Sequence, residues 1–159
     1  MSDAEGLHLL LRVRTARIVR LAVRERIPAI STNSEETIEN ILSGSSFAVI
    51  GSFKDKSKYS YRILLNLIAL GKEVYPVNPR GGTVEDLKCY KSVTDIPADV
   101  NAVTIVTPPE VTEKIVAECK EKGIKNVWLQ PGAQSKRAVD YCNENGINVI
   151  YNTCMYLRL

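Results

Sequence analysis

Backbone amides and basic side chains that suit a phosphate gather after the first β-rich run of the chain. Residues 47–50 read F-A-V-I, and Gly51 follows where a strand would turn into a helix. Amide groups at such a turn, with the start of the next helix, can hold a phosphate. Residues 51–56 read G-S-F-K-D-K and lack the second and third glycines of the dinucleotide fingerprint. We expect a phosphate-binding turn over residues 51–54, with an ordinary tight turn at Gly51 as the alternative.

The end of the second β-rich run, residues 73–77, separates the classes of nucleotide. An NAD site places Asp or Glu about 20 residues after the glycines, to bind the ribose 2′-hydroxyl. Here that place holds Asn78, Pro79 and Arg80, without a carboxylate. A guanidinium suits a phosphate on the ribose, which NADP carries at the 2′ and coenzyme A at the 3′ position. NADP and coenzyme A therefore pass this test and NAD does not, while a solvated loop charge is the alternative role for Arg80.

Two more loops follow β-rich runs and complete the candidate site. Thr107 and the two prolines after it follow residues 102–106, and Q-P-G at 130–132 follows residues 126–129. The Gln130 amide can donate and accept toward an adenine or a pantetheine amide. Residues 54–62 form a basic stretch, in which Lys54 and Arg62 are the preferred phosphate contacts. The candidate cofactor-binding residues are Gly51, Ser52, Phe53, Lys54, Arg62, Asn78, Pro79, Arg80, Thr107, Pro108, Pro109, Gln130 and Gly132.

These loops belong to a regular alternation of strands and helices. The pattern predicts strands over 47–50, 73–77, 102–106, 126–129 and 147–151, and helices over 35–42, 58–70, 108–122 and 135–145. Alternation of this kind predicts the α/β class: a doubly wound, mainly parallel five-stranded Rossmann-like sheet with helices on both faces. Ligands of such sheets bind at the carboxyl ends of the strands, where the strand order reverses.

Several local details accompany this prediction. Asn33 or Ser34 can cap the first helix, and Thr107 is expected to cap the third, with Pro108 as its first helical residue. The third helix should bury a stripe of Val111, Ile115, Val116 and Cys119, and Trp128 should lie in the core.

Charge divides the chain at residue 33. Residues 1–33 hold six arginines, no lysine and three acids, whereas residues 34–159 hold 15 basic and 15 acidic residues. We expect a leader of unknown role over 1–33 and a binding domain over 34–159. The leader is interpreted as a packed helix or an extension, with an organellar transit peptide as the alternative. A neutral domain gives no reason to propose nucleic acid as a partner.

The cysteines and hydropathy limit the class of protein further. Cys89, Cys119, Cys142 and Cys154 form no CxxC pair and have no histidine at zinc spacing, so we expect no metal site. Free thiols without a secretory signal predict a reducing, cytoplasmic location. No apolar run approaches the roughly 18 residues that span a bilayer, so no membrane role is expected.

The motifs resemble those of the small stand-alone coenzyme A-binding proteins, whose fold is akin to the amino-terminal domain of the succinyl-CoA synthetase alpha subunit. The most specific matching stretches are V-Y-P-V-N-P-R at 74–80 and V-W-L-Q-P-G at 127–132. The resemblance implies that Gly51 and Ser52 bind the diphosphate and that Arg62 and Arg80 serve the phosphates. It also implies that Asn78 and Pro79 shape the adenosine side, and that Pro108, Pro109 and Gln130 form the other wall. The sequence departs from the family pattern at 51–53, G-S-F in place of G-A-S, and at 153–154, T-C in place of R-C.

These observations predict a coenzyme A or acyl-CoA binding module that is non-catalytic by itself and acts as a sensor, a homodimer or the partner of an enzyme subunit. The one histidine, His8, lies in the leader, which excludes phosphohistidine ligase chemistry for this chain alone. One alternative is an NADP-linked reductase with Tyr61 as the acid. Another is a protein-interaction domain on an empty nucleotide fold. Cys154 could form a mixed disulfide with the coenzyme A thiol, or it could be a buried, inert cysteine.

Overall fold

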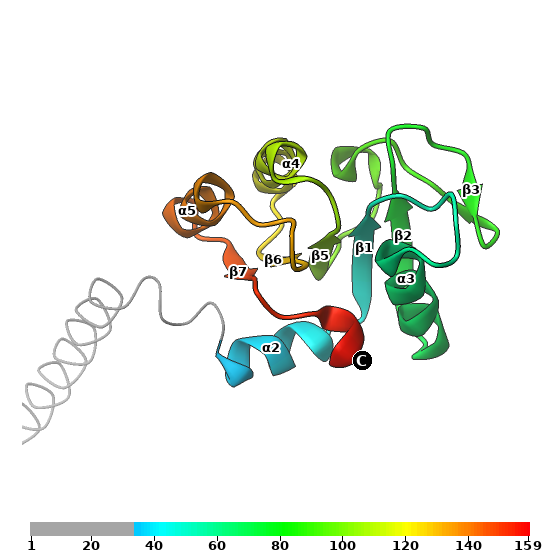
Figure 1. Ribbon diagram of the computed structural model, residues 1–159, viewed down its shortest axis with the longest axis horizontal. Helices are drawn as coiled ribbons and strands as arrows, with labels where there is room; N and C mark the ends of the chain where they lie inside the picture. Colours follow the sequence, from blue (N-terminus) through cyan, green and yellow to red (C-terminus); the bar gives the residue numbers. More distant parts are fainter. Residues whose placement is uncertain (1–33) are drawn as a thin grey trace, which may run out of the picture. The chain divides into compact units, whose positions relative to one another are not determined.

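The computed structural model describes residues 34–159, and a parallel five-stranded sheet organises this part of the chain (Figure 1). Its strands are β1 (Ser46–Ile50), β2 (Glu73–Val77), β5 (Ala102–Ile105), β6 (Asn126–Leu129) and β7 (Asn148–Ile150). They lie in the order β2-β1-β5-β6-β7, and every neighbouring pair is parallel. The chain runs outward from β1 to β2 and then returns to the other side of β1 to form β5. The strand order therefore reverses between β1 and β5, and this is the switch point of the sheet.

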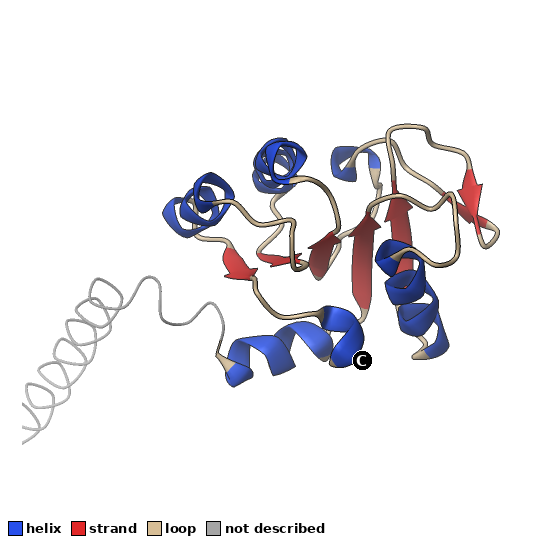
Figure 2. Cartoon of the chain, viewed as in Figure 1, coloured by secondary structure: helices blue, strands red, loops and turns tan. Residues whose placement is uncertain are grey.

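Helices cover both faces of this sheet, as Figures 1 and 2 show. One face carries α2 (Glu35–Leu42), α3 (Tyr59–Ala69) and the short 3-10 turn η2 (Met155–Leu157). The opposite face carries α4 (Pro109–Lys122), α5 (Lys136–Glu144) and the 3-10 turn η1 (Val93–Asp95). A small antiparallel hairpin of β3 (Thr83–Val84) and β4 (Leu87–Lys88) lies beside the edge strand β2. The predicted doubly wound α/β fold is confirmed.

Alternate residues of β1 point into two separate hydrophobic clusters. Phe47 and Val49 pack against α2 and α3, whereas Ala48 and Ile50 pack against α4 and η1. All five residues of β1 are buried, because a central parallel strand is covered on both faces. Trp128 of β6 is fully buried as predicted, and its indole Nε1 donates to the Thr153 carbonyl oxygen over 2.7 Å.

The predicted start of α4 was wrong by one residue. Pro108, not Thr107, is the capping residue, and Pro109 is the first residue of the helix. A residue that precedes proline is disfavoured in the helical region, and Pro108 accordingly has an extended ψ of 150°. The predicted burial of Val111 was also wrong, because this side chain is 43% exposed and lines a cleft. The neighbouring Thr112 takes the buried position.

The cap of α2 lies at one of the two residues that were predicted for it. Of the two candidates for α2, Ser34 is the cap, and its Oγ accepts from the Thr37 amide.

The leader predicted over residues 1–33 lies outside the described residues. Within residues 34–159, none of the helices has the length and apolar character needed to cross a bilayer.

Candidate functional site

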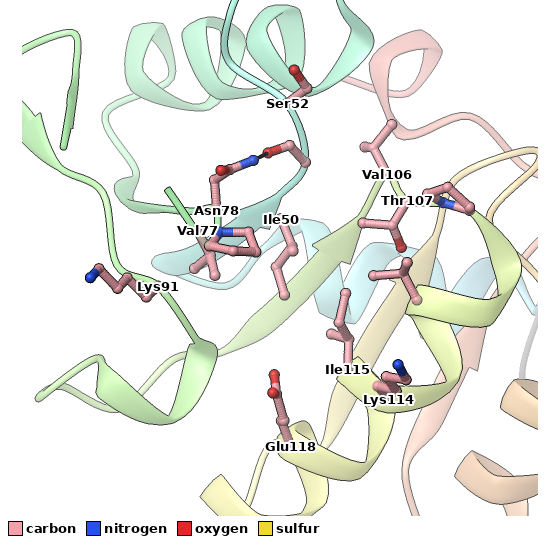
Figure 3. Close-up of a pocket in the computed structure, with 14 residues that line it drawn as sticks. Ile50, Ser52, Val77, Asn78, Lys91, Val106, Thr107, Lys114, Ile115 and Glu118 are labelled. Carbon is pink, nitrogen blue, oxygen red and sulfur yellow. Dashed lines mark hydrogen bonds between the residues drawn. The ribbon is translucent and has the colours of Figure 1, made fainter. Parts of the chain in front are cut away.

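A cleft of about 370 Å³ opens at the switch point of the sheet (Figure 3). Three strand ends form it: Gly51 and Ser52 follow β1, Asn78 and Pro79 follow β2, and Thr107 and Pro108 precede α4. These six residues were all predicted to belong to the site, and the structure brings them together. They meet because parallel strands present their carboxyl ends along one edge, and β1 lies between β2 and β5.

Gly51 is required by close packing between β1 and α3. A Cβ atom at this position would lie 2.6 Å from the Cβ atom of Ser60 and 3.2 Å from the Val106 carbonyl oxygen. The Gly51 amide donates to the Val77 carbonyl oxygen over 3.2 Å. The glycine therefore lets α3 begin close to the sheet, and its amide extends the β1–β2 ladder by one bond.

Asn78 joins the loops that follow β1 and β2. Its Nδ2 donates to the Gly51 carbonyl oxygen over 2.7 Å, a bond drawn in Figure 3, and its Oδ1 accepts from the Arg80 amide over 3.0 Å. Asn78 thus fixes the floor of the cleft and the turn that carries Arg80. The Arg80 side chain is exposed beside the cleft and is not among its lining residues.

Charged side chains on two walls of the cleft had not been predicted. Lys114 and Glu118 come from α4, and Lys91 comes from the segment after β4, on the opposite side in Figure 3. Val111, Lys114 and Glu118 are spaced three and four residues apart, so they share one face of α4. That spacing could have revealed them once the start of α4 was known. No local signal marks Lys91, because the β3–β4 hairpin carries it to the cleft.

A second cavity of about 280 Å³ adjoins the first, and Val106 lines both. Arg62 reaches it from α3, Gln130 and Pro131 from the end of β6, and Cys154 from the segment before η2. Two predicted residues, Arg62 and Gln130, therefore lie in this cavity and not in the switch-point cleft. The Gln130 amide is used within the fold: Nε2 donates to Thr104 Oγ1 over 2.8 Å, and Oε1 accepts from the Met155 amide over 3.0 Å.

Other predicted residues line neither cavity. The Phe53 ring packs edge-on against the Tyr61 ring with centroids 6.3 Å apart, and Lys54 is exposed. Pro109 begins α4, and Gly132 occupies a turn with a φ of 92°. Together with Arg80, these residues follow lining residues in the sequence but line neither cavity themselves.

Hydrogen bonds and burial shift several pKa values near these cavities. The side-chain and backbone hydrogen bonds from Ser57 lower the pKa of Asp55, so this carboxylate stays charged among the lysines before α3. The Tyr61 hydroxyl donates to Glu85, and this bond raises the Tyr61 pKa. All four cysteines are free, and burial raises the pKa of three of them, Cys89, Cys119 and Cys142. Cys154 alone among them lines one of the two cavities.

Comparison with known proteins supports the resemblance. A family model described as a CoA binding domain matches residues 45–159. The chain is 35% identical over 119 residues to the alpha subunit of the ADP-forming acetate–CoA ligase II of Pyrococcus furiosus, which covers 68% of this chain and 26% of the subunit. It is 40% identical over 84 residues to the ADP-forming acetate–CoA ligase of Methanocaldococcus jannaschii, which covers 53% of this chain and 12% of the ligase. The chain thus spans about a quarter or less of the length of these curated relatives.

A shorter solved structure also matches over its whole length. A conserved hypothetical protein from Pyrococcus furiosus superposes with a TM-score of 0.69 and 35% identity, over 73% of this chain and 100% of that protein. The predicted relation to small coenzyme A-binding proteins and to a ligase alpha subunit is confirmed.

Proposed function

Because this chain belongs to the CoA-binding domain family, we propose that its switch-point cleft binds coenzyme A or an acyl-CoA. The observation that carries the proposal is the meeting of the loops after β1 and β2 with the start of α4 around one cleft, held in place by the Asn78–Gly51 hydrogen bond. This is the place where doubly wound sheets bind their ligands.

The charges around the cleft suit the phosphates of coenzyme A. Lys91 and Lys114 stand on opposite walls and offer ammonium groups to the diphosphate, with Ser52 at the end of β1. Arg80, on the turn fixed by Asn78, is the group we assign to the ribose 3′-phosphate. Val77 and Pro79 would then pack against the adenosine.

We further propose that the chain binds its ligand without catalysing a reaction by itself. The sequence holds one histidine, His8, and it lies outside the described residues. The acid that the reductase alternative needs, Tyr61, donates its hydroxyl to Glu85 and lines neither cavity. The roles that we propose for such a chain are a sensor, a homodimer or the partner of an enzyme subunit. The last role is supported by one relative, which is named as a ligase alpha subunit. A cytoplasmic location remains part of the proposal.

Calorimetric titration of coenzyme A into paired charge variants tests this function. The double variant Lys91→Gln with Lys114→Gln should lose about tenfold or more in affinity, because even one charge-assisted contact contributes about 1.5–3 kcal/mol. Lys120→Gln with Lys125→Gln is the matched control, since it removes the same charge from exposed residues that line neither cavity. Equal affinities in the two double variants would show that the ligand binds elsewhere.

A further inference from the structure

The switch-point cleft and the second cavity lie on opposite sides of the carboxyl end of β5. The cleft is bounded by α4, and the second cavity by the start of α3 and by η2. Val106, the first residue after β5, lines both. A ligand that crosses the carboxyl end of β5 therefore passes directly from the cleft into the second cavity.

The walls of the second cavity are mainly apolar. Tyr59 and Tyr156 pack edge to face with ring centroids 6.4 Å apart, and Pro131 and Leu157 complete this surface. Leu157 is 81% exposed, so it lies at the open rim of this surface. Such walls favour a hydrocarbon group over a polar one.

The buried Gln130 amide in this cavity needs no hydrogen bond from a ligand. Gln130 is only 3% exposed, and both ends of its amide are bonded within the fold. One of these bonds, with the Met155 amide, also holds η2 against the end of β6, and the Trp128 indole bonds the residue before Cys154. The cavity therefore keeps its shape without a ligand, because two hydrogen bonds fix the turn that forms its outer wall.

We infer that the second cavity holds the acyl group of an acyl-CoA, so that the chain prefers thioesters with a short or medium apolar chain to free coenzyme A. This inference rests on the proposed function. With adenosine beside β2 and the diphosphate near Ser52, the pantetheine leads across Val106, and the thioester arrives beside Arg62. A volume of about 280 Å³ equals roughly nine water-sized volumes of about 30 Å³, enough for a chain of several carbons.

A chain-length series tests the inference on the full-length protein. Calorimetric titration with coenzyme A, acetyl-CoA, butyryl-CoA and hexanoyl-CoA should show affinity that rises by up to about fourfold for each buried methylene. We expect hexanoyl-CoA to bind at least about tenfold more tightly than coenzyme A. Equal affinity across the series would overturn the inference and leave the proposed function intact. Failure of all four ligands to bind would overturn both.

A pair of leucine variants locates the effect. Leu157→Asp places a carboxylate at the mouth of the cavity, and at 81% exposure it leaves the core unchanged. It should abolish the gain from the acyl chain while coenzyme A affinity changes by less than about twofold, because Leu157 does not line the cleft. Leu70→Asp, at a leucine that is 53% exposed at the end of α3 and lines neither cavity, should keep the whole gain. A chain-length gain that survives Leu157→Asp would refute the assignment of the acyl group to this cavity.

Discussion

Replacement of Asn78 by alanine removes the side chain that joins the loops after β1 and β2. Two hydrogen bonds are lost, one to the Gly51 carbonyl oxygen over 2.7 Å and one from the Arg80 amide over 3.0 Å. A hydrogen bond contributes about 0.5–1.5 kcal/mol to stability, and a buried group left without a partner costs more than an exposed one. Gly51 is buried and Arg80 is exposed, so the first bond carries most of the effect. We expect Asn78→Ala to lower the free energy of unfolding by about 1.5–2 kcal/mol.

Urea unfolding followed by fluorescence measures this loss, because the chain contains one tryptophan, Trp128, and it is fully buried. Asn148→Ala is the matched control: its Nδ2 bonds Asn126 Oδ1 over 3.0 Å in an exposed position at the amino end of β7. The control should lose about 0.5 kcal/mol or less and keep its affinity for coenzyme A. Asn78→Ala should bind coenzyme A more weakly, since the loops of the cleft are no longer joined. Equal stability losses in the two variants, or unchanged affinity in Asn78→Ala, would refute the role given to Asn78.

Four further predictions concern the two cavities and the loops beside them. Arg80→Glu should weaken coenzyme A binding by about 2 kcal/mol or more and dephospho-CoA binding much less, as titration calorimetry would measure, and equal losses would remove Arg80 from the 3′-phosphate. Gly51→Ala should destabilise the domain by about 1–3 kcal/mol in urea unfolding, because the new Cβ would lie 2.6 Å from the Cβ atom of Ser60; wild-type stability would contradict this packing. Iodoacetamide should label Cys154 first in the native protein, because burial raises the pKa of the other three thiols. The pKa of Cys142, for example, is raised to about 12. Peptide mass spectrometry identifies the labelled cysteine. Mild oxidation with coenzyme A should then add one coenzyme A to Cys154, and an unchanged protein mass would exclude the mixed disulfide.

The elements of the domain could be predicted because each carries a strong local signal. The strands are short β-rich runs such as F-A-V-I at 47–50, and Ser34 and Ser135 mark the starts of α2 and α5. The start of α4 was misplaced because two prolines follow Thr107, and the sequence rule for a single proline does not decide between them. The β3–β4 hairpin was not predicted, since its turn uses Glu85 and Asp86 at positive φ in place of the usual Asn-Gly.

The candidate site was predicted in part because strand ends can be recognised in a sequence, whereas the order of strands cannot. The loops after β1, β2 and β5 meet in the cleft because these strands are neighbours. Gln130 follows β6, one strand farther out, and therefore lies in the second cavity. Lys91 and Lys114 reach the cleft from a hairpin and from a helix face, which tertiary structure alone brings together.

Parallel calorimetric titration of the full-length protein with coenzyme A, dephospho-CoA, NADP and NAD tests the proposed function most directly. We predict that coenzyme A binds at micromolar concentration, that dephospho-CoA binds more weakly, and that NAD does not bind. A ligand at 100 times its dissociation constant should also stabilise the fold by about 2.7 kcal/mol, which thermal unfolding checks independently. Absence of binding by all four ligands, or binding of NAD as tight as that of coenzyme A, would contradict the proposal that the switch-point cleft is a coenzyme A site.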